Sequence, residues 1–254
     1  MKNDTLHQLI STYQPISLNE MDAVALMDRV DNKFVFNIFQ LFDILSECIN
    51  EYRILEINSV RNHLYDSVYF DTNNFDLYLH HHNQRLNRYK IRFRKYVTSN
   101  GLTFFEIKYK DNKEKTYKKR KKHIDIEYQI KDELKPFLIQ QSSLNSDELF
   151  PSLKIKYNRI TLVHKNLNER VTIDTQLEFD NFQNTYSFNN IVIAEVKRNS
   201  YSEHTTFLKL LHQHHIREGG LSKYCTGVAL TYSNIKKNNF LPKLRYFEKI
   251  NNLC

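Results

Sequence analysis

Charged residues recur at two-residue spacing in five segments that are otherwise rich in Ile, Val, Phe and Tyr. Residues two apart on a β-strand point to the same face of a sheet, so each segment directs charge to one side and apolar side chains to the other. The chain is therefore expected to build a sheet with one charged face. The five segments are Arg92-x-Arg94, Glu106-x-Lys108, Lys118-x-Arg120, Arg170-x-Thr172-x-Asp174 and Glu195-x-Lys197.

The cations of these segments would repel one another if they met inside a fold, unless carboxylates and a bound polyanion neutralised them. A single alternating pair is usually a solvated sheet face. An ordered set of five favours a β-lined, cation-rich cavity for a phosphate-like ligand. The cations concerned are Arg92, Arg94, Lys108, Lys118, Arg120 and Lys197.

Composition limits the kind of protein. With 254 residues, of which 41% are hydrophobic, the chain is long enough for a substantial core, and we expect a single domain over 1–254. Its core should span about 25–235, followed by a loosely held, Lys- and Asn-rich tail over 236–254. The net charge of +8 predicts an anionic partner, which could be a nucleic acid, a membrane surface or a polyphosphorylated molecule.

The three cysteines, Cys48, Cys225 and Cys254, have neither an even count nor a CxxC spacing, so a disulfide framework or a zinc site is not expected. Reduced thiols fit a cytoplasmic protein. No run of about 18 apolar residues and no signal-peptide pattern is present.

Only four glycines occur, and neither GxxxxGK[ST] nor GxGxxG can be built from them. If this protein holds phosphates, side chains must do so in place of a glycine-rich backbone loop.

The periodicity of apolar residues predicts an α+β fold in which helices flank a run of strands. Asn37 is expected to cap a helix, and Gly101 is expected to supply the positive φ of a hairpin turn over 99–101. The expected helices cover two short stretches within 4–28, then 38–50, a turn or two after Asn73, 130–139, 203–215 and 221–235. The expected strands cover 29–36, 52–60, 64–71, 88–96, 102–110, 116–127, 153–164, 169–174, 177–180 and 191–198.

In one expected strand, the alternation of apolar and charged residues is inconsistent. Ile124 and Ile126 would share the face of Lys118 and Arg120 if the strand over 116–127 were regular. A bulge near His123, or a strand that leaves the cavity for the core, would remove the conflict. Two of the five residues in the basic run 118–122 are expected inside. The histidine clusters at 80–82 and 212–215 are expected on exposed helix faces.

The order of these motifs over about 25–230 resembles the polyphosphate polymerase domain of the vacuolar transporter chaperone (VTC) family, a branch of the CYTH or triphosphate tunnel metalloenzyme superfamily. A single ExK or RxR motif is weak support, whereas the ordered series is specific. The series comprises Arg29-x-Asp31-x-Lys33, Tyr69-Phe-Asp71-Thr72, Lys90-Ile-Arg92-Phe-Arg94, Glu106-Ile-Lys108, Thr116-Tyr-Lys118-Lys-Arg120, Tyr157-Asn-Arg159, Arg170-Val-Thr172-Ile-Asp174, Glu195-Val-Lys197 and Ser222-Lys223-Tyr224.

The resemblance implies an eight-stranded antiparallel β-barrel, the triphosphate tunnel fold, with helices packed on its outside. It also implies a basic lumen that moves the γ-phosphoryl group of ATP onto a growing polyphosphate chain with help from Mn²⁺ or Mg²⁺. Most of the wider superfamily carries ExExK in the first strand, where this chain has Arg29 and Asp31 at the two glutamate positions. This departure favours the VTC branch over triphosphatases and adenylyl cyclases, and it implies fewer bound metal ions.

Roles follow from the resemblance and from side-chain chemistry. Guanidinium groups grip phosphate oxygens in bidentate fashion, whereas lysines act as mobile point charges. Carboxylate oxygens suit a hard divalent cation, and a helix N-terminus favours an anion. The expected ligand-contacting residues are Lys33, Arg92, Arg94, Lys108, Lys118, Arg120, Arg159, Arg170 and Lys197, with Arg29, Ser222 and Lys223 as further contacts. The expected metal ligand is Glu195, with Glu106 and Asp174 as possible second ligands.

Two other functions stay open. The same tunnel could hydrolyse triphosphate or polyphosphate with water as acceptor, or it could bind polyphosphate or nucleic acid without catalysis. An aromatic platform alternating with basic residues would favour nucleic acid, but here the cations alternate with carboxylates. The expected partners are therefore ATP and inorganic polyphosphate or triphosphate, with no specific nucleic acid. A membrane partner is left open.

Overall fold

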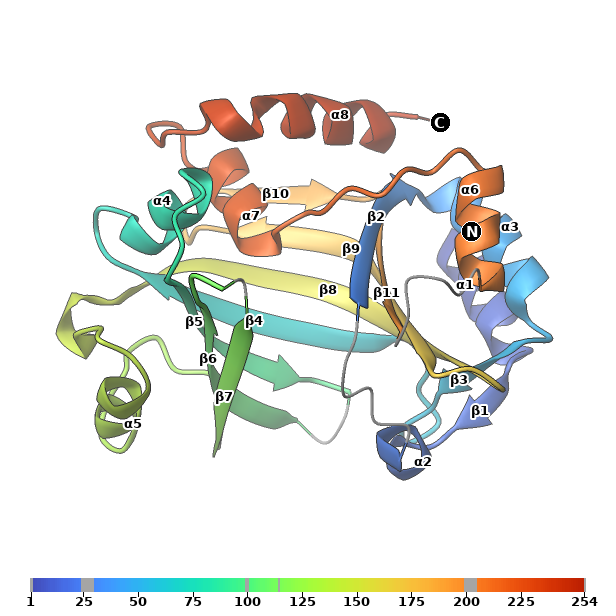
Figure 1. Ribbon diagram of the computed structural model, residues 1–254, viewed down its shortest axis with the longest axis horizontal. Coiled ribbons are helices and arrows are strands. Elements are labelled where there is room, and N and C mark those ends of the chain that lie inside the picture. Colours follow the sequence, from blue (N-terminus) through green and yellow to red (C-terminus); the bar gives the residue numbers. More distant parts are fainter. Residues whose placement is uncertain (1, 24–29, 99–100, 114, 199–204, 254) are drawn as a thin grey trace.

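One long, curved antiparallel sheet organises the computed structural model, which describes residues 2–23, 30–98, 101–113, 115–198 and 205–253 (Figure 1). Eight strands pair in the order β2-β11-β9-β8-β4-β5-β6-β7. Their bounds are β2 (Val30–Asn37), β4 (His63–Asp71), β5 (Arg88–Tyr96), β6 (Leu102–Lys110), β7 (Thr116–His123), β8 (Phe150–His164), β9 (Glu169–Asp180) and β11 (Ile191–Arg198). Three short strands, β1 (Gln14–Ile16), β3 (Tyr52–Leu55) and β10 (Thr185–Phe188), attach at its margins.

The sheet curls without closing. Strands β2 and β7 end the row, and no ladder joins them within the described residues. In Figure 1, β8 and β9 cross behind, with β2 on one side and β7 on the other. The prediction of eight antiparallel strands with accompanying helices is confirmed, but the closed barrel is replaced by a trough.

The helices are α1 (Lys2–Ser11), α2 (Leu18–Ala23), α3 (Ile38–Cys48), α4 (Asp76–His82), α5 (Leu134–Gln141), α6 (Thr206–Gln213), α7 (Lys223–Thr231) and α8 (Leu241–Asn251). Asn37 caps α3 as expected, because its Oδ1 accepts from Phe39 N at 3.0 Å while the Gln40 side chain accepts from Asn37 N at 3.3 Å. Helices α1, α3 and α6 bury their apolar faces against the outside of the sheet, around Phe34, Val171 and Val196. α5 covers another part of the outer face, near Phe105.

Helix α7 lies on the inner face of the sheet, unlike the predicted arrangement in which the helices pack outside. Its Gly227 fits closely over Leu153 of β8 and Phe179 of β9. Leu153 has the same strand parity as Tyr157 and Arg159, whose side chains point into the trough. The helix therefore fills one part of the trough and leaves the rest to charged residues.

A β-bulge explains why the sequence indicated two strands where the structure has one. Between β8 and β9 the pairing passes from Lys156↔Glu178 to Asn158↔Thr175, so β9 contains one extra residue. Gln176 lies there with φ of 52°. The extra residue flips the parity, so that the polar residues before it and the apolar residues after it both face inward.

The conflict at Ile124 and Ile126 has a simple resolution, since β7 ends at His123. Ile124 is 94% exposed, whereas Ile126 packs at the edge of the apolar cluster under α5. At the preceding hairpin, Gly101 has the expected positive φ of 66°. Residues 99 and 100 of that turn lie outside the described residues.

The C-terminal segment is more ordered than predicted. A short 3₁₀ turn (Asn238–Phe240) leads into α8, which buries Leu244, Phe247 and Ile250. Asn37 also donates from Nδ2 to the Ile250 carbonyl at 2.7 Å. The expectation of a loosely held tail was wrong for this segment, because an apolar stripe at helical spacing lies hidden among its many Lys and Asn residues.

We predict that Gly227→Val destabilises the protein by about 1–3 kcal/mol, because a Cβ at this position would lie 2.5 Å from both Leu153 Cδ2 and Phe179 Cδ1. Chemical denaturation would measure the loss. Gly219→Val is the matched control, since nothing lies within 4 Å of a Cβ built there. Equal unfolding midpoints for the two variants would contradict close packing of α7 inside the trough.

Candidate functional site

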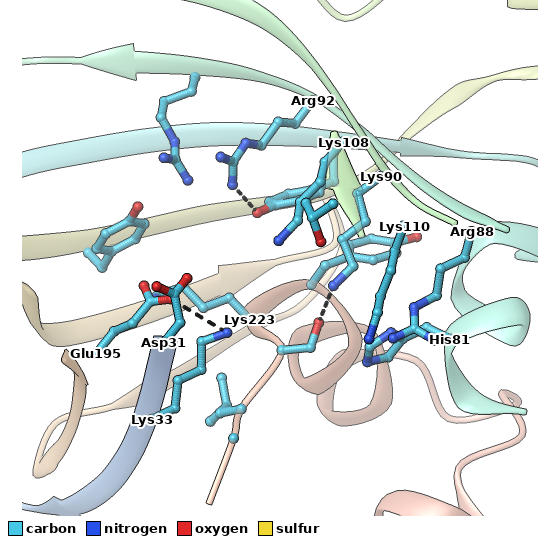
Figure 2. Close-up of a pocket in the computed structure, with 18 of the residues that line it drawn as sticks. Asp31, Lys33, His81, Arg88, Lys90, Arg92, Lys108, Lys110, Glu195 and Lys223 are labelled. Carbon is cyan, nitrogen blue, oxygen red and sulfur yellow. Dashed lines mark hydrogen bonds and ion pairs between the residues drawn. The ribbon is translucent and has the colours of Figure 1, made fainter. Parts of the chain in front are cut away.

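A strongly basic cavity of about 590 Å³ occupies the part of the trough that α7 leaves open. Among the described residues, its wall carries nine Lys or Arg side chains and only two carboxylates. The strands supply most of them, and the start of α7 supplies the rest (Figure 2). The charged residues in the wall are Lys33, Arg88, Lys90, Arg92, Arg94, Lys108, Lys110, Arg159, Lys223, Asp31 and Glu195.

Glu106 is the buried anchor of one side of the cavity. Arg92 donates from Nε to Glu106 Oε2 at 2.7 Å, and Lys118 Nζ lies 2.6 Å from Oε1. Burial acts to raise the pKa of Glu106, but Arg92, Arg94 and Lys118 outweigh it and hold the pKa well below its usual range. This carboxylate is therefore ionised and fixes the two cations beside it.

Asp174 is the corresponding anchor on the opposite wall. Arg159 grips it with two parallel hydrogen bonds, from Nε to Oδ1 at 2.6 Å and from Nη2 to Oδ2 at 2.7 Å. Lys223 at the start of α7 donates to the same Oδ2. Burial works against ionisation, yet Arg159 and Lys223 keep the pKa of Asp174 far below its ordinary value.

Glu195 and Asp31 form a third, more open acidic group. Lys197 Nζ lies 2.8 Å from Glu195 Oε1 and 3.3 Å from Asp31 Oδ2, and Lys33 Nζ lies 3.6 Å from Glu195 Oε1. Burial raises the pKa of Glu195, but Lys197 and Lys33 more than compensate and lower it to about 2. Both of these carboxylates, unlike Glu106 and Asp174, line the cavity itself.

Lysines and arginines face one another along β5 and β6. Lys90 is directly opposite Lys108, and Arg88 is opposite Lys110. Partial desolvation, together with the charges of Lys90 and Lys33, lowers the pKa of Lys108 to about 8. Like charges in facing positions destabilise a sheet, so this part of the wall is set up to receive an anion.

Tyrosines connect the cavity wall to α7. Arg92 donates from Nη1 to the Tyr69 hydroxyl at 2.6 Å, and the ring of Tyr69 stacks on Tyr224 with centroids 5.0 Å apart. Tyr224 in turn donates to the buried Asp71 at 2.5 Å. Burial would raise the pKa of Tyr69, but Arg92, Arg94 and Lys90 lower it to about 8.

The start of α7 faces the cavity. Ser222 is the N-cap, and its Oγ accepts from Cys225 N at 3.4 Å and from Lys90 Nζ at 2.9 Å. Lys223 is the first residue of the helix and reaches Asp174. Both residues therefore lie where the sequence predicted a phosphate-contacting helix start.

Some of the predicted site residues line the cavity, and others support it from behind. Lys33, Arg92, Arg94, Lys108, Arg159, Glu195, Ser222 and Lys223 line the cavity. Lys118, Lys197, Glu106 and Asp174 support it through ion pairs.

Three predicted residues lie elsewhere. Arg120 is exposed on β7, over the ring of Phe104 at 4.8 Å. Arg170 faces Lys197 across the β9–β11 ladder and does not line the cavity. Arg29 lies outside the described residues.

Sequence reasoning missed several residues of the wall, namely Asp31, Tyr69, His81, Arg88, Lys90 and Lys110. A signal existed for five of them. Asp31 and Lys90 share strand parity with Lys33 and Arg92, Tyr69 stands in a quoted motif, and Arg88 and Lys110 extend the same alternation by one step.

The two histidine clusters differ in their exposure to solvent. His212 and His215 are exposed, as predicted, but the cluster at 80–82 is not. His82 is 1% exposed and accepts from Asn239 N, while His81 lines the cavity. Burial, reinforced by Lys90 and Arg88, lowers the pKa of His81 to about 3, so its ring is neutral near pH 7.

Few side chains of the cavity could coordinate a metal ion. Within the described part of the chain, no group of three or more His, Cys, Asp or Glu side chains is placed to hold one. Glu106 and Asp174 are each occupied by an Arg and a Lys. Glu195 and Asp31 are also paired with lysines, but both line the cavity. A pair of carboxylates is enough for Mg²⁺ when substrate phosphates supply further oxygens. The donor set therefore fits an ion shared with a phosphate ligand.

No helix in the described ranges has the length and apolar character needed to cross a bilayer.

Comparison with solved structures concerns the fold of this chain. A search of curated proteins found no match. Among solved structures, a candidate adenylyl cyclase from Hippeastrum, described as having a dominant triphosphatase activity, is 14% identical over 82% of this chain and 98% of its own, with a TM-score of 0.52. A candidate adenylate cyclase from Bacillus halodurans is 12% identical over 77% of this chain and 94% of its own, with a TM-score of 0.47.

The structural likeness to the Hippeastrum protein supports the tunnel fold alone, because the sequences are so different. The family comparison reaches further along the sequence. The VTC domain matches residues 28–232, which include every strand of the main sheet and the whole of α7. This chain therefore belongs to the VTC domain family.

Proposed function

We propose that this protein is a polyphosphate polymerase that transfers the γ-phosphoryl group of ATP onto a growing inorganic polyphosphate chain. The observation that carries the proposal is the charge of the cavity, where nine cations meet two carboxylates among the described residues. Such an excess needs a ligand with several negative charges close together. A phosphate chain has this property, and the VTC family match supports the same ligand class.

Phosphoryl transfer needs little covalent help from a protein, but it needs fixed positive charge around the transferred group. Glu106 and Asp174 hold Arg92 and Arg159 in place before any ligand arrives. Those guanidinium groups pay no reorganisation cost when charge develops on the phosphate. Lys33, Lys108 and the other lysines are mobile and can follow the phosphate oxygens as the transfer proceeds.

A divalent cation, when bound, would neutralise phosphate oxygens and polarise the transferred group. Glu195 and Asp31 would hold it. Both carboxylates face the cavity, and both lie within ion-pair distance of the same lysine, Lys197. The neighbouring lysines outweigh the effect of burial and lower the pKa of Glu195 to about 2, so it is an anion at any physiological pH.

Hydrolysis of triphosphate or polyphosphate is the second candidate. It would use the same cations, with water as acceptor in place of the polymer end. The likeness to the Hippeastrum protein, which is described as having a dominant triphosphatase activity, favours keeping this candidate. At 14% identity that likeness concerns the fold, so the choice rests on product analysis.

Incubation of the purified protein with ATP and Mn²⁺ should yield long-chain polyphosphate, seen as a ladder on a gel stained for the polymer. Mg²⁺ in place of Mn²⁺ and an incubation without metal complete the experiment. Release of orthophosphate without any polymer would overturn the polymerase proposal in favour of hydrolysis. Neither polymer nor orthophosphate would argue for a binding protein.

Glu195→Gln should keep or slightly tighten the affinity for tripolyphosphate while losing metal-dependent turnover at least about 100-fold. The reason is that the change removes a carboxylate ligand and also releases Lys33 and Lys197 from their ion pairs. Calorimetry would measure binding, and initial rates over a metal titration would measure turnover. Glu178→Gln is a matched control, since Glu178 pairs only loosely with Lys156 at 3.9 Å. Full metal-dependent activity in Glu195→Gln would remove Glu195 from the metal site.

Affinity for tripolyphosphate should fall by about tenfold as pH rises from 7.5 to 10. Lys108 and Tyr69 both have pKa values lowered to about 8, so the cavity loses one cation and gains one anion over this range. An anion bound beside Lys108 favours its charged form, so binding is strongest below that pKa. Further ionisation of tripolyphosphate over this window acts on every variant alike, so a comparison between variants isolates the contribution of the protein.

The control for this pH dependence is Lys108→Arg, because a guanidinium stays charged above pH 12. Its affinity should fall less steeply than that of the wild type. Parallel curves for the two proteins would show that Lys108 does not titrate against the ligand.

A further inference from the structure

His81 is an imidazole ring that lies among cations. It comes from α4 and lines the basic cavity at the same end as Arg88 and Lys110 (Figure 2). The ring of Phe240 stacks on it with centroids 6.2 Å apart. The Nδ1 atom of His81 is buried, and none of the described residues gives it a hydrogen-bond partner. An imidazolium has an N–H on both nitrogens, so a protonated ring here buries a donor that has no acceptor.

The charges that act most strongly on this ring are all positive. They come from β5, α8 and β6 and are, in decreasing order of effect, Lys90, Arg88, Lys243 and Lys108. Other titratable neighbours are His80 and His82 on α4 itself and Cys225 of α7, which lines a small adjoining pocket together with His81. Burial raises the pKa of the Cys225 thiol, so it carries no charge. The carboxylates of the cavity wall, Glu195 and Asp31, lie at its other end (Figure 2).

These surroundings keep His81 neutral until a ligand arrives. Burial and the four cations lower its pKa to about 3. A triphosphate or polyphosphate in the same cavity would bring several negative charges among those cations and reverse the sign of the charge near the ring. Relief of repulsion and the approach of opposite charge both favour the imidazolium, and together they can raise a histidine pKa by about 3 units.

We propose that His81 takes up a proton when a triphosphate or polyphosphate enters the cavity, and so becomes a further cation of the wall only while the ligand is bound. The proton comes from solvent and adds to the ring nitrogen that is bare in the neutral imidazole, and no other bond forms or breaks. This inference rests on the proposed function and adds to it a coupling between ligand binding and pH.

A histidine suits this position better than a permanent cation would. On β5 and β6, Lys90 already faces Lys108, and Arg88 faces Lys110. Like charges in facing positions cost stability, so a further permanent charge beside them would add to that cost in the absence of ligand. A ring that is neutral without ligand avoids the cost and still contributes a charge to the complex.

The direction of the coupling follows from the number of bound protons. If the ligand raises the pKa of His81 from about 3 to about 6, the complex holds more protons than the free protein between those two values. Affinity must then rise as pH falls through about 6. Lys108 and Tyr69, whose pKa values are about 8, titrate above this window, so the two effects are separable.

The first test follows the histidine ring protons of the wild-type protein by NMR over a pH titration, with and without saturating tripolyphosphate and without metal. The resonance missing from His81→Gln identifies His81, and His81→Asn provides a second identification. The pKa of His81 should rise by at least about 3 units when the ligand is bound. His212, which is exposed on α6, should shift little and serves as the internal reference.

The second test measures proton uptake by calorimetry at pH 6 in two buffers that differ in ionisation enthalpy. The wild type should take up at least about 0.5 proton more than His81→Gln on binding tripolyphosphate. The ratio of their affinities, wild type to variant, should rise about fourfold from pH 7.5 to pH 5.5. Protonation of the ligand itself cancels in both comparisons. His212→Gln is the matched control and should behave as the wild type does.

The outcomes separate this coupling from the proposed function. Tight binding of tripolyphosphate with an unshifted His81 resonance, or with equal proton uptake in the wild type and His81→Gln, would overturn the coupling while leaving the polymerase proposal intact. An equal loss of proton uptake in His212→Gln would also overturn it, because the proton would then not be specific to His81. A wild-type protein that does not bind tripolyphosphate would overturn the proposed function itself.

Discussion

The whole site depends on two buried carboxylates. Glu106 and Asp174 are almost inaccessible to water, with 1% and 2% of their surface exposed, and each holds one Arg and one Lys. Without them, the inward-facing guanidinium groups of Arg92 and Arg159 would be buried charges with no compensation, which is costly in a protein interior. The two anions make it possible for a sheet to turn so much positive charge toward one cavity.

These anchors also explain why the cavity can be both rigid and adaptable. Arg92 and Arg159 are fixed by short hydrogen bonds, whereas Lys108 has only cations as its nearest charged neighbours on the facing strand. A ligand therefore meets a preorganised part of the cavity, at Arg92 and Arg159, and a part that can adjust to it, at Lys108. Under the proposed function, the first would suit the transferred phosphoryl group, and the second would suit a chain that moves as it grows.

Helix α7 converts an open trough into a site. It fills the apolar part over Leu153 and Phe179, and its first residues reach the cavity through Ser222 and Lys223. Tyr224 ties the helix to Asp71 and to the ring of Tyr69, which in turn contacts Arg92. Because closure of the sheet is incomplete, this helix takes over part of the role that a closed barrel wall would have.

The sequence alone determined the strands and the capped helix after Asn37. It also determined the inward direction of Arg92, Lys108 and Glu195. Alternation along a strand and capping of a helix both depend on residues that are close in sequence. Tertiary structure decided which charges meet. The pairing of Glu106 and Asp174 with cations, and the freedom of Glu195 to face the cavity, depend on strand register and on a bulge at Gln176. Long-range packing likewise decided the path of α7 inside the trough, the open seam between β2 and β7, and the burial of the apolar side of α8. Local spacing carries no information on these contacts.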